Sequence, residues 1–574
     1  MKRNCLAAML ATIMAGCAAT AAPQGDDQAL VQSAEITLTQ KYLLYPIKNG
    51  APKSEVSLSV DGKEVRFYTA ALAGNAEEVA WWAFEDVREY TGRKAVLAVT
   101  GITGEGFGLI RQSDTVPGSE TWGSESFRPQ FHISQKVGWI NDPNGMVYQD
   151  GEWHVFFQHN PVGLQWGNMT WGHVVSRDLI HWTQLPNALQ HRRGPDAMFS
   201  GGAAIDRKNT AGWKTGDQDV ILITWTSTGR GECIAFSNDG GRTFTEYEGN
   251  PIIRHKGRDP KPLWYPYGKG ETALSERAAG LGGHWVIAVY DEDPQAGKNI
   301  AIYTSTDLKS WTVQSRLPGY YECPELFSLP VDGKEDDLRW VIFSGDARYA
   351  IGRFDGRTFT PEHEGKHTLH HGRGCDYFAS QLFSEAPDNR RIQVGWLRNF
   401  NAGGVPFSQG FSFPTELTLR STPTGVRMFG NPVREIGKIH RDKQAVHDKP
   451  LAEGKPVRLN TSGALLDIRA TIEIGQARRI GINIDDKRTF IYDVPAQKMD
   501  GAPVTPVDGR VSVRFLVDRG IVEAFVNDGE AVISGPFQGD LDIGAVEAFA
   551  EGGEARLVSL EAIKLEASWK GSGE

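Results

Sequence analysis

Three acidic residues lie directly before a proline or one residue away from it, and their surroundings make them the strongest candidates for chemistry. The first, Asp142, lies in the run Trp139-Ile140-Asn141-Asp142-Pro143-Asn144-Gly145. Proline disfavours helical backbone in the residue before it, and Asn-Gly is typical of a tight turn. We therefore expect the Asp142 carboxylate to be held at a strand end, where the Asn141 amide and the turn amides keep it ionised. Such an acid suits attack on a substrate; the alternative is an ordinary Asx-Pro turn.

The other two acids have related surroundings. Asp259 lies in Arg258-Asp259-Pro260, beside a guanidinium group, and Glu322 lies in Tyr321-Glu322-Cys323-Pro324. The apolar, aromatic flanks predict a partly desolvated Glu322, and desolvation favours the protonated carboxyl group that a general acid needs. The Cys323 thiol is an alternative nucleophile, but no Cys-His motif supports it.

These three segments, in this order, resemble those of glycoside hydrolase family 32, the β-fructofuranosidases, which include invertases, inulinases and levanases. The resemblance runs from about Phe127 to about Leu565. One matching segment would be weak evidence, whereas an ordered set is specific. The further matching segments are Phe156-Phe157-Gln158-His159-Asn160-Pro161, Trp171-Gly172-His173-Val174-Val175-Ser176, Phe199-Ser200-Gly201-Gly202 and Asp376-Tyr377-Phe378-Ala379.

The resemblance implies a retaining mechanism that needs no cofactor or metal. Asp142 would be the nucleophile that forms a covalent fructosyl-enzyme, and Glu322 the general acid and then the base. Asp259 would bind the fructose hydroxyls and stabilise the transition state. The implied substrate contacts, each of which could instead be structural, are Asn141, Gln158, Trp166, Phe199, Ser200, Arg258, Asp376 and Trp396, with Trp139 as an apolar wall.

A repeated pattern indicates the elements that position these residues. Ser176 to Trp182, Ser237 to Phe244 and Ser305 to Trp311 each lead from a serine through an Asp turn to an aromatic residue, and Phe354 to Phe359 is a weaker copy. The copies lie roughly 60 residues apart, near the length of a propeller blade. We predict a five-bladed β-propeller over residues 126–425, as the resemblance also implies; unrelated hairpins are the alternative.

The flanking sequence predicts two further β domains, so the fold class is all-β. Short alternating runs at 55–60, 64–68 and 95–100 indicate a small N-terminal β-sandwich over residues 33–120, which family 32 enzymes do not generally carry. After a linker at 426–444, alternating strands over 445–568 predict a C-terminal β-sandwich, which the family also implies.

The N-terminus predicts export. Lys2 and Arg3 precede an apolar stretch too short to span a bilayer, which is typical of a signal peptide over residues 1–22. Gly16-Cys17 indicates lipidation of Cys17, with residues 23–32 as a tether and the cell envelope as the location; cleavage near Ala21 or Ala22, giving a periplasmic or secreted protein, is the alternative. Membrane contact is then expected only through the lipid.

Charge and composition limit the partners. The net charge is −10 with no long basic run, which argues against nucleic acid and fits a neutral sugar substrate. Cys233, Cys323 and Cys375 are too few and too separated for a disulfide framework. The histidines at 367, 370 and 371 lack an acid or cysteine partner at metal-binding spacing, so a solvated loop is the better interpretation.

We therefore expect an enzyme that removes terminal β-D-fructofuranosyl units from levan, inulin or sucrose. Polar candidates on several blades around a single ring favour a closed pocket and exo-action. The alternatives are an endo-acting levanase or inulinase, a fructosyltransferase, and a catalytically silent fructan-binding protein. Departures from the family pattern at Gly257, Gly202, Thr170 and Tyr377-Phe378 leave the linkage preference open.

Overall fold

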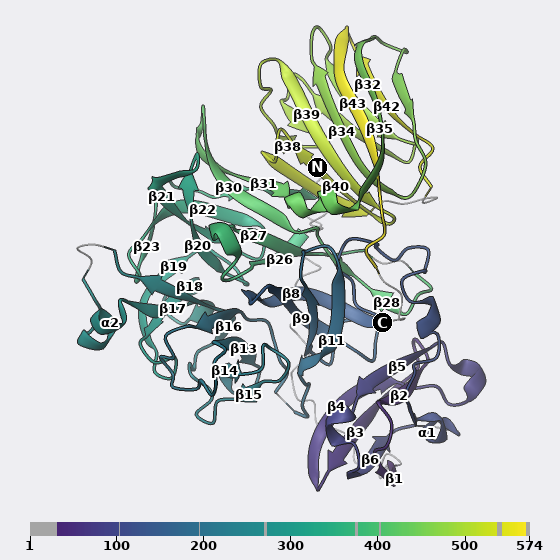
Figure 1. Ribbon diagram of the computed structural model, residues 1–574, viewed down its shortest axis with the longest axis vertical. Helices are drawn as coiled ribbons and strands as arrows, with labels where there is room; N and C mark the ends of the chain where they lie inside the picture. Colours follow the sequence, from purple (N-terminus) through teal and green to yellow (C-terminus); the bar gives the residue numbers. More distant parts are fainter. Residues whose placement is uncertain are drawn as a thin grey trace.

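The computed structural model describes residues 31–102, 104–194, 196–268, 272–372, 377–400, 403–536 and 542–569. It is all-β: a small N-terminal domain, a five-bladed β-propeller and a C-terminal β-sandwich (Figure 1). None of the helices in these residues is long and apolar enough to cross a membrane. Two residues expected to be functional, Cys17 and Asp376, lie outside the described residues.

The N-terminal domain consists of two small sheets with a shared apolar core. One sheet has the order β1-β6-β3-β4 and the other β5-β2-β7. Alternating side chains of β3 are buried, and they join apolar residues of the second sheet in one cluster. The first strand starts at Val31, inside the expected tether. The bounds are β1 (Val31–Thr37), β2 (Tyr42–Ile47), β3 (Lys53–Val60), β4 (Lys63–Ala71), β5 (Trp81–Asp86), β6 (Lys94–Thr100) and β7 (Arg111–Ser113), followed in this list by the short helix α1 (Gly106–Leu109).

The propeller follows as five four-stranded blades. The blades are β8 (Gly138–Gln149), β9 (Glu152–Asn160), β10 (Thr170–Ser176) and β11 (Trp182–Leu189); β12 (Ala203–Asp206), β13 (Val220–Ser227), β14 (Gly231–Ser237) and β15 (Thr245–Glu246); β16 (Gly257–Pro266), β17 (Gly283–Asp293), β18 (Gly297–Ser305) and β19 (Thr312–Pro318); β20 (Glu325–Val331), β21 (Lys334–Phe343), β22 (Arg348–Phe354) and β23 (Phe359–Pro361); and β26 (Tyr377–Leu382), β27 (Ile392–Leu397), β30 (Thr415–Thr422) and β31 (Gly425–Pro432). Helix α2 (Glu276–Leu281) precedes β17.

The repeated sequence pattern marks one junction of the blades. In each of the first three blades it connects the third strand to the fourth, and the weaker copy does so in the fourth blade. In the first blade the Asp178 carboxylate accepts hydrogen bonds from the backbone N–H groups of Ile180 and His181. Corresponding bonds to aspartate occur in the second and third blades. The pattern therefore repeats because each blade needs the same satisfied turn.

The propeller ring is closed by a short strand in the connection between β27 and β30 of the fifth blade. β28 (Phe407–Ser408) pairs in parallel with β8 of the first blade. The first strands β8, β12 and β16 contact one another in sequence, and β8 also contacts β26. These first strands consequently lie nearest the propeller axis.

The C-terminal sandwich has a seven-stranded and a six-stranded sheet. Residues 426–444 are not the expected irregular linker, because they contain most of β31, the 3-10 helix η5 (Arg434–Ile439) and the start of β32. β25 leaves the propeller and pairs in parallel with β41 of the sandwich. In sheet order the strands are β25 (His370–Gly372), β41 (Ala531–Pro536), β40 (Ile521–Val526), β39 (Arg510–Asp518), β34 (Leu465–Glu473), β43 (Ala555–Leu565) and β32 (His440–Leu451), then β33 (Val457–Asn460), β42 (Ala545–Glu551), β35 (Arg479–Ile484), β36 (Arg488–Asp493), β37 (Lys498–Met499) and β38 (Ala502–Pro503).

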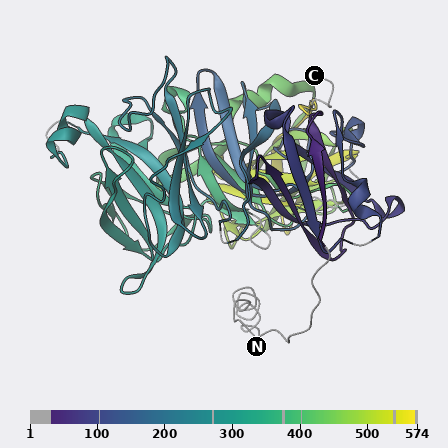
Figure 2. The same ribbon diagram turned by 90° about the horizontal axis from the view of Figure 1, so that it is seen from below.

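The N-terminal domain and the sandwich contact different parts of the propeller. Figure 1 shows the sandwich above the propeller and the N-terminal domain, in purple, below β11. Figure 2, seen from below, again places the purple sheets beside the propeller. The first blade is thus the part of the propeller that meets the N-terminal domain.

Candidate active site

Asp142 lies in an irregularity of the first strand of the first blade. The pairing of β8 with β9 shifts between Ile140 and Pro143, so the Asn141-Asp142 pair falls in a bulge. The expected tight turn at a strand end is wrong, because β8 continues to Gln149. Gly145 instead serves a second shift within the strand, where its φ is +50°. A bulge re-aims a side chain without ending the strand, which explains how the carboxylate leaves the ladder.

Asp259 and Glu322 also lie on unusual backbone. The pairing of β16 with β17 shifts between Arg258 and Lys261, and Asp259 has φ +69°. Glu322 and Cys323, just before β20, have φ +51° and +40°. Left-handed backbone is uncommon for residues other than glycine and clusters at functional sites. Asp259 and Glu322 therefore lie on strained backbone, whereas Asp142 leaves its ladder through a bulge.

Cys323 connects two of the acids. Its backbone N–H donates to Asp259 Oδ2 at 3.0 Å, and its Sγ lies 3.5 Å from Asp259 Oδ2 and 3.8 Å from Asp142 Oδ2. The Glu322 carboxylate accepts a hydrogen bond from Arg258, whose Nε lies 4.0 Å from Asp259 Oδ2, so carboxyl groups from the first, third and fourth blades meet in one place. The structure thus brings together the three acids that the sequence analysis selected.

Burial dominates the electrostatics of the two aspartates. It raises the pKa of Asp142, although hydrogen bonds from Ser200, at 2.6 Å, and Asn141, at 3.1 Å, partly offset it. The expectation that nearby amides alone keep Asp142 ionised therefore understated desolvation. Burial raises the pKa of Asp259 to about 7; Arg258 opposes this shift and Asp142 adds to it.

Glu322 is not in the apolar setting expected from its neighbours. The Arg258 guanidinium donates a hydrogen bond to Glu322 Oε1 and lies 4.0 Å from Asp259. The rings of Tyr290 and Tyr321 flank the same guanidinium. The sequence neighbours of Glu322 were a poor guide because this contact comes from another blade.

Aromatic residues form walls on two sides of the acids. Trp139 donates through Nε1 to Asn141 Oδ1 at 3.0 Å, and its ring meets Trp396 of the fifth blade edge to face at 6.1 Å. Trp166 meets Phe199 edge to face at 5.9 Å, and Phe199 is the neighbour of Ser200. Gln158 is buried and donates to the Met198 carbonyl, where it supports the Phe199-Ser200 segment. The described candidates thus surround the acids.

A chain of buried polar groups behind Asp259 was missed by sequence reasoning. The Asp259 N–H donates to Thr226 Oγ1, which donates to Glu232 at 2.7 Å. His255 then bridges Glu232 and Asp291 at 2.6 and 3.0 Å. Burial would lower the pKa of His255, but these two carboxylates raise it. Only the position of His255 shortly before Arg258 could have drawn attention to it.

Two other sequence candidates have structural surroundings. Burial and the charges of Asp259 and Asp142 hold the pKa of the Cys323 thiol well above its usual range, so the thiol stays protonated and unsuited to attack. Cys233 and Cys323 are both free. His370 is not in a solvated loop: it is buried in β25, stacked on Tyr377 at 3.5 Å.

A propeller with carboxyl groups from several blades at one end of its axis is the architecture of a class of glycoside hydrolases. Comparison with known families identifies the group. Residues 132–432 match the family model "Glycosyl hydrolases family 32 N-terminal domain", and residues 435–564 match "Glycosyl hydrolases family 32 C terminal". The chain belongs to glycoside hydrolase family 32.

Relatives extend the comparison. The chain is 35% identical over 505 residues to a levanase of Bacillus subtilis (strain 168), covering 78% of this chain and 71% of the levanase. It is 26% identical over 535 residues to an extracellular exo-inulinase of Aspergillus awamori, covering 78% and 96%. The crystal structure of exo-inulinase from Aspergillus awamori has a TM-score of 0.68 at 24% identity and supports the fold alone; the match covers 78% of this chain and 99% of that one. The matched family segments start at residue 132, after the N-terminal domain.

Proposed function

We propose that this protein is a retaining exo-β-fructosidase that releases fructose from levan or inulin, and also from sucrose. The observation that carries the proposal is the meeting of acids from three blades: Cys323 contacts Asp142 and Asp259, and Arg258 links Glu322 to Asp259. Glycoside cleavage requires one carboxyl group that donates a proton and a second that attacks the sugar. The family membership and the levanase and exo-inulinase relatives support the substrate class.

In the proposed first step Asp142 attacks C2 of the terminal fructosyl unit. The bond from C2 to the bridging oxygen breaks, and Glu322 gives its proton to that oxygen. In the second step Glu322 takes a proton from water as the water oxygen attacks C2, which frees fructose and restores the Asp142 carboxylate. Arg258, which contacts Glu322, also binds hydroxyl groups of the sugar in this proposal.

Exo-action rests on the walls around the acids. The Trp139–Trp396 pair and the Trp166–Phe199 pair supply aromatic surfaces near the acids, and Asn141 and Ser200 add polar groups that bond Asp142; such a set suits the binding of a single terminal ring. Endo-action is the second candidate, because the same groups would contact the cleaved sugar in an open cleft. We also propose that the chain is exported, on the strength of its charged and then apolar N-terminus.

The deciding experiment is product analysis with variants of the acid pair. Wild type should release free fructose from levan, inulin or sucrose from the earliest times. Asp142→Asn and Glu322→Gln should each lower kcat by roughly 10³-fold or more while the folded structure is retained.

Four outcomes would contradict parts of the proposal. An early ladder of oligosaccharides without fructose indicates endo-action. Products in which fructose has been transferred to sucrose, at high sucrose concentration, indicate a transferase. Full activity of either variant removes its residue from the mechanism, and binding without any product indicates a silent fructan-binding protein.

A further inference from the structure

The N-terminal domain holds the loop between β9 and β10, residues 161–169. Val162 of this loop is 2% exposed and belongs to the hydrophobic core of the N-terminal domain, against which Leu164 also packs. A propeller loop thus places its apolar side chains in the other domain. Removing that domain would expose them to water, so the loop depends on it for its conformation.

A side-chain amide connects the same loop to a sheet edge. β4 is an edge strand, and outward-facing backbone groups of its Thr69 are satisfied by Asn168. The Thr69 N–H donates to Asn168 Oδ1 at 2.8 Å, and Asn168 Nδ2 donates to the Thr69 carbonyl at 2.9 Å and to Asn160 Oδ1 at 3.0 Å. Asn168 has φ +45° and is 8% exposed. The Asn168 amide thus makes the two hydrogen bonds with Thr69 that a neighbouring strand would otherwise make at this edge.

The held loop carries Trp166 at the rim of the active site. Trp166 lies two residues before Asn168 and is 56% exposed. Its ring contacts Phe199, whose neighbour Ser200 donates to Asp142. Trp166 therefore lies beyond Phe199 as seen from the acids. At that position it can contact the sugar units that follow the fructose bound at Asp142.

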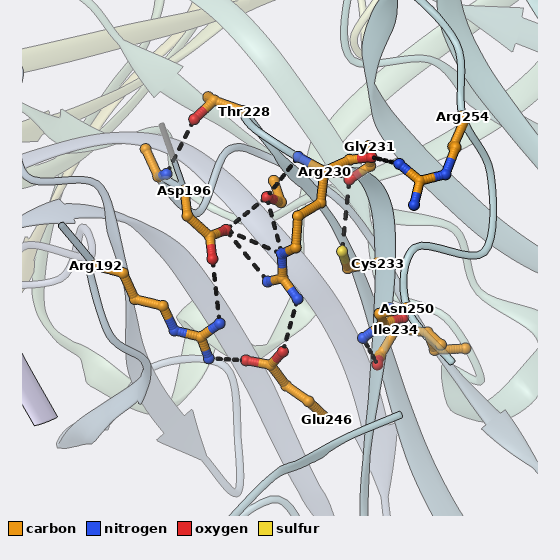
Figure 3. A network of polar contacts seen from close by, with 12 residues as sticks. Arg192, Asp196, Thr228, Arg230, Gly231, Cys233, Ile234, Glu246, Asn250 and Arg254 are labelled. Carbon is orange, nitrogen blue, oxygen red and sulfur yellow. Dashed lines mark hydrogen bonds and ion pairs between the residues drawn. The ribbon is translucent and has the colours of Figure 1, made fainter. Parts of the chain in front are cut away.

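The segment that leads to Phe199 has its own anchors in the propeller. Figure 3 shows Asp196 beside Arg230, and Ser227 donates to the Asp196 carboxylate at 2.5 Å. The Ala197 N–H donates to Thr228 Oγ1 at 3.0 Å. Arg193 contacts the N-terminal domain through ion pairs with Glu55 and Glu64 and through the Phe67 ring at 4.1 Å, and such contacts between part-exposed side chains stabilise little. Phe199 is therefore held by the propeller itself, whereas the loop that carries Trp166 depends on the N-terminal domain.

We infer that the N-terminal domain positions the Trp166 rim through Val162 and Asn168, and thereby sets the affinity for the sugar units beyond the cleaved fructose. The inference rests on the proposed function. Asn168 and Thr69 act in it as positioning residues, since neither touches the reacting atoms. The domain that lies outside the family models thus acquires a role in substrate binding.

The test separates binding from chemistry with Asn168→Gly. Glycine keeps the left-handed backbone and removes the amide. We expect KM for levan or inulin to rise roughly threefold to tenfold, within the range of coupling between residues in contact. The kcat and its pH profile should stay unchanged, because the acids are not moved. Asn168→Asp keeps the bond from the Thr69 N–H but sets a carboxylate oxygen against the Thr69 and Asn160 oxygens, so it should raise KM to a similar extent, and it serves if the glycine variant is unstable.

Two further variants make the test specific. In a Trp166→Ala background Asn168→Gly should have no additional effect on KM, whereas a general loss of stability would act in both backgrounds. Arg193→Gln removes ion pairs between the same two domains without touching the loop, and it should leave KM unchanged.

The failures are distinguishable. Wild type that releases no fructose from levan, inulin or sucrose refutes the proposed function. Active wild type with an unchanged KM in Asn168→Gly, an equal effect of that change in both backgrounds, or a fall in kcat alone overturns the positioning inference.

Discussion

At the scale of single residues, the protonated form of Asp259 stabilises the fold, whereas the ionised form is the one proposed to bind sugar. Burial raises the pKa of Asp259 to about 7, well above its value of about 3.9 in an unfolded chain. The folded protein therefore binds the Asp259 proton more tightly than the unfolded chain does. The contribution of the Asp259 proton to the free energy of unfolding is fully present below about pH 4 and is lost as the pH rises through about 7. The same carboxylate is proposed to bind sugar in its ionised form.

We expect Asp259→Asn to raise the stability of the protein and to lower its activity. Asparagine tolerates the left-handed backbone at this position but does not titrate. The variant should unfold at a higher temperature than wild type, with a larger difference at pH 8 than at pH 5. Its kcat/KM should fall by roughly 100-fold. Thermal unfolding at both pH values and initial rates check this; an equal shift at both pH values contradicts the assignment.

The wild-type pH profile offers a second measurement on the same group. The acid limb of kcat/KM reports the ionising groups of the free enzyme. Because Asp142 and Asp259 interact, the limb belongs to the coupled site. We expect its midpoint near pH 7, and a midpoint near 4 would be inconsistent with the desolvation found here.

At the scale of elements, the blades are uniform in their turns and irregular at their inner strands. The third and fourth strands are joined by the same aspartate-capped turn in the first three blades. The inner strands β8 and β16 are instead interrupted where they carry Asp142 and Asp259. The turns thus repeat from blade to blade, while β8 and β16 are interrupted at the positions that carry the two aspartates.

The capped turns predict a stability effect without an effect on chemistry. Burial alone would raise the pKa of Asp178, but hydrogen bonds from the backbone and side chain of His181 lower it to about 2. Its contribution is present above about pH 4 and is lost as the pH falls through about 2. Asp178→Ala should lower the free energy of unfolding by about 1–2 kcal/mol at pH 7 and leave kcat unchanged.

Urea unfolding at pH 7 measures this change, with Asp178→Asn as the matched control. Asparagine retains one acceptor oxygen for the backbone N–H groups of the turn, so Asp178→Asn should lower the free energy of unfolding less than Asp178→Ala does. A loss of kcat with unchanged stability would show that the turn communicates with the site, against our expectation.

At the scale of the whole molecule, a buried histidine joins the propeller to the sandwich. His132, before β8, lies between Asp518 and Glu523 of the sandwich at 2.8 and 2.9 Å. Asp518 also accepts from the backbone N–H groups of residues 130–132. Burial would lower the pKa of His132, but the two carboxylates raise it to about 9. The stability from this charge is present below about pH 6.5 and is lost as the pH rises through about 9.

We expect His132→Gln to destabilise the joint by about 3–5 kcal/mol at pH 6, because two buried carboxylates lose their cation. The difference from wild type should shrink at pH 9.5. Urea unfolding followed at both pH values provides the measurement, and a pH-independent difference would argue against a charged His132.

Local sequence patterns predicted the architecture, and together with the family resemblance they selected the three acids. The Ser-Asp-aromatic pattern predicts the blades because each turn satisfies its hydrogen bonds within a few residues. The segments around Asp142, Asp259 and Glu322 are equally short, so their order along the chain could be compared with a family without a structure. The strands at 53–60, 63–71 and 94–100 likewise follow from alternation.

What only the tertiary structure decided depends on contacts between residues far apart in the chain. The Arg258 contact with Glu322 joins two blades, and it replaced the apolar setting that sequence neighbours suggested. The Glu232–His255–Asp291 chain and the Thr69–Asn168 contact join residues in different elements, so no spacing announces them. The acids were predictable because each lies in a short segment whose order along the chain matches a family; their protonation was not, because desolvation is set by everything that packs around them.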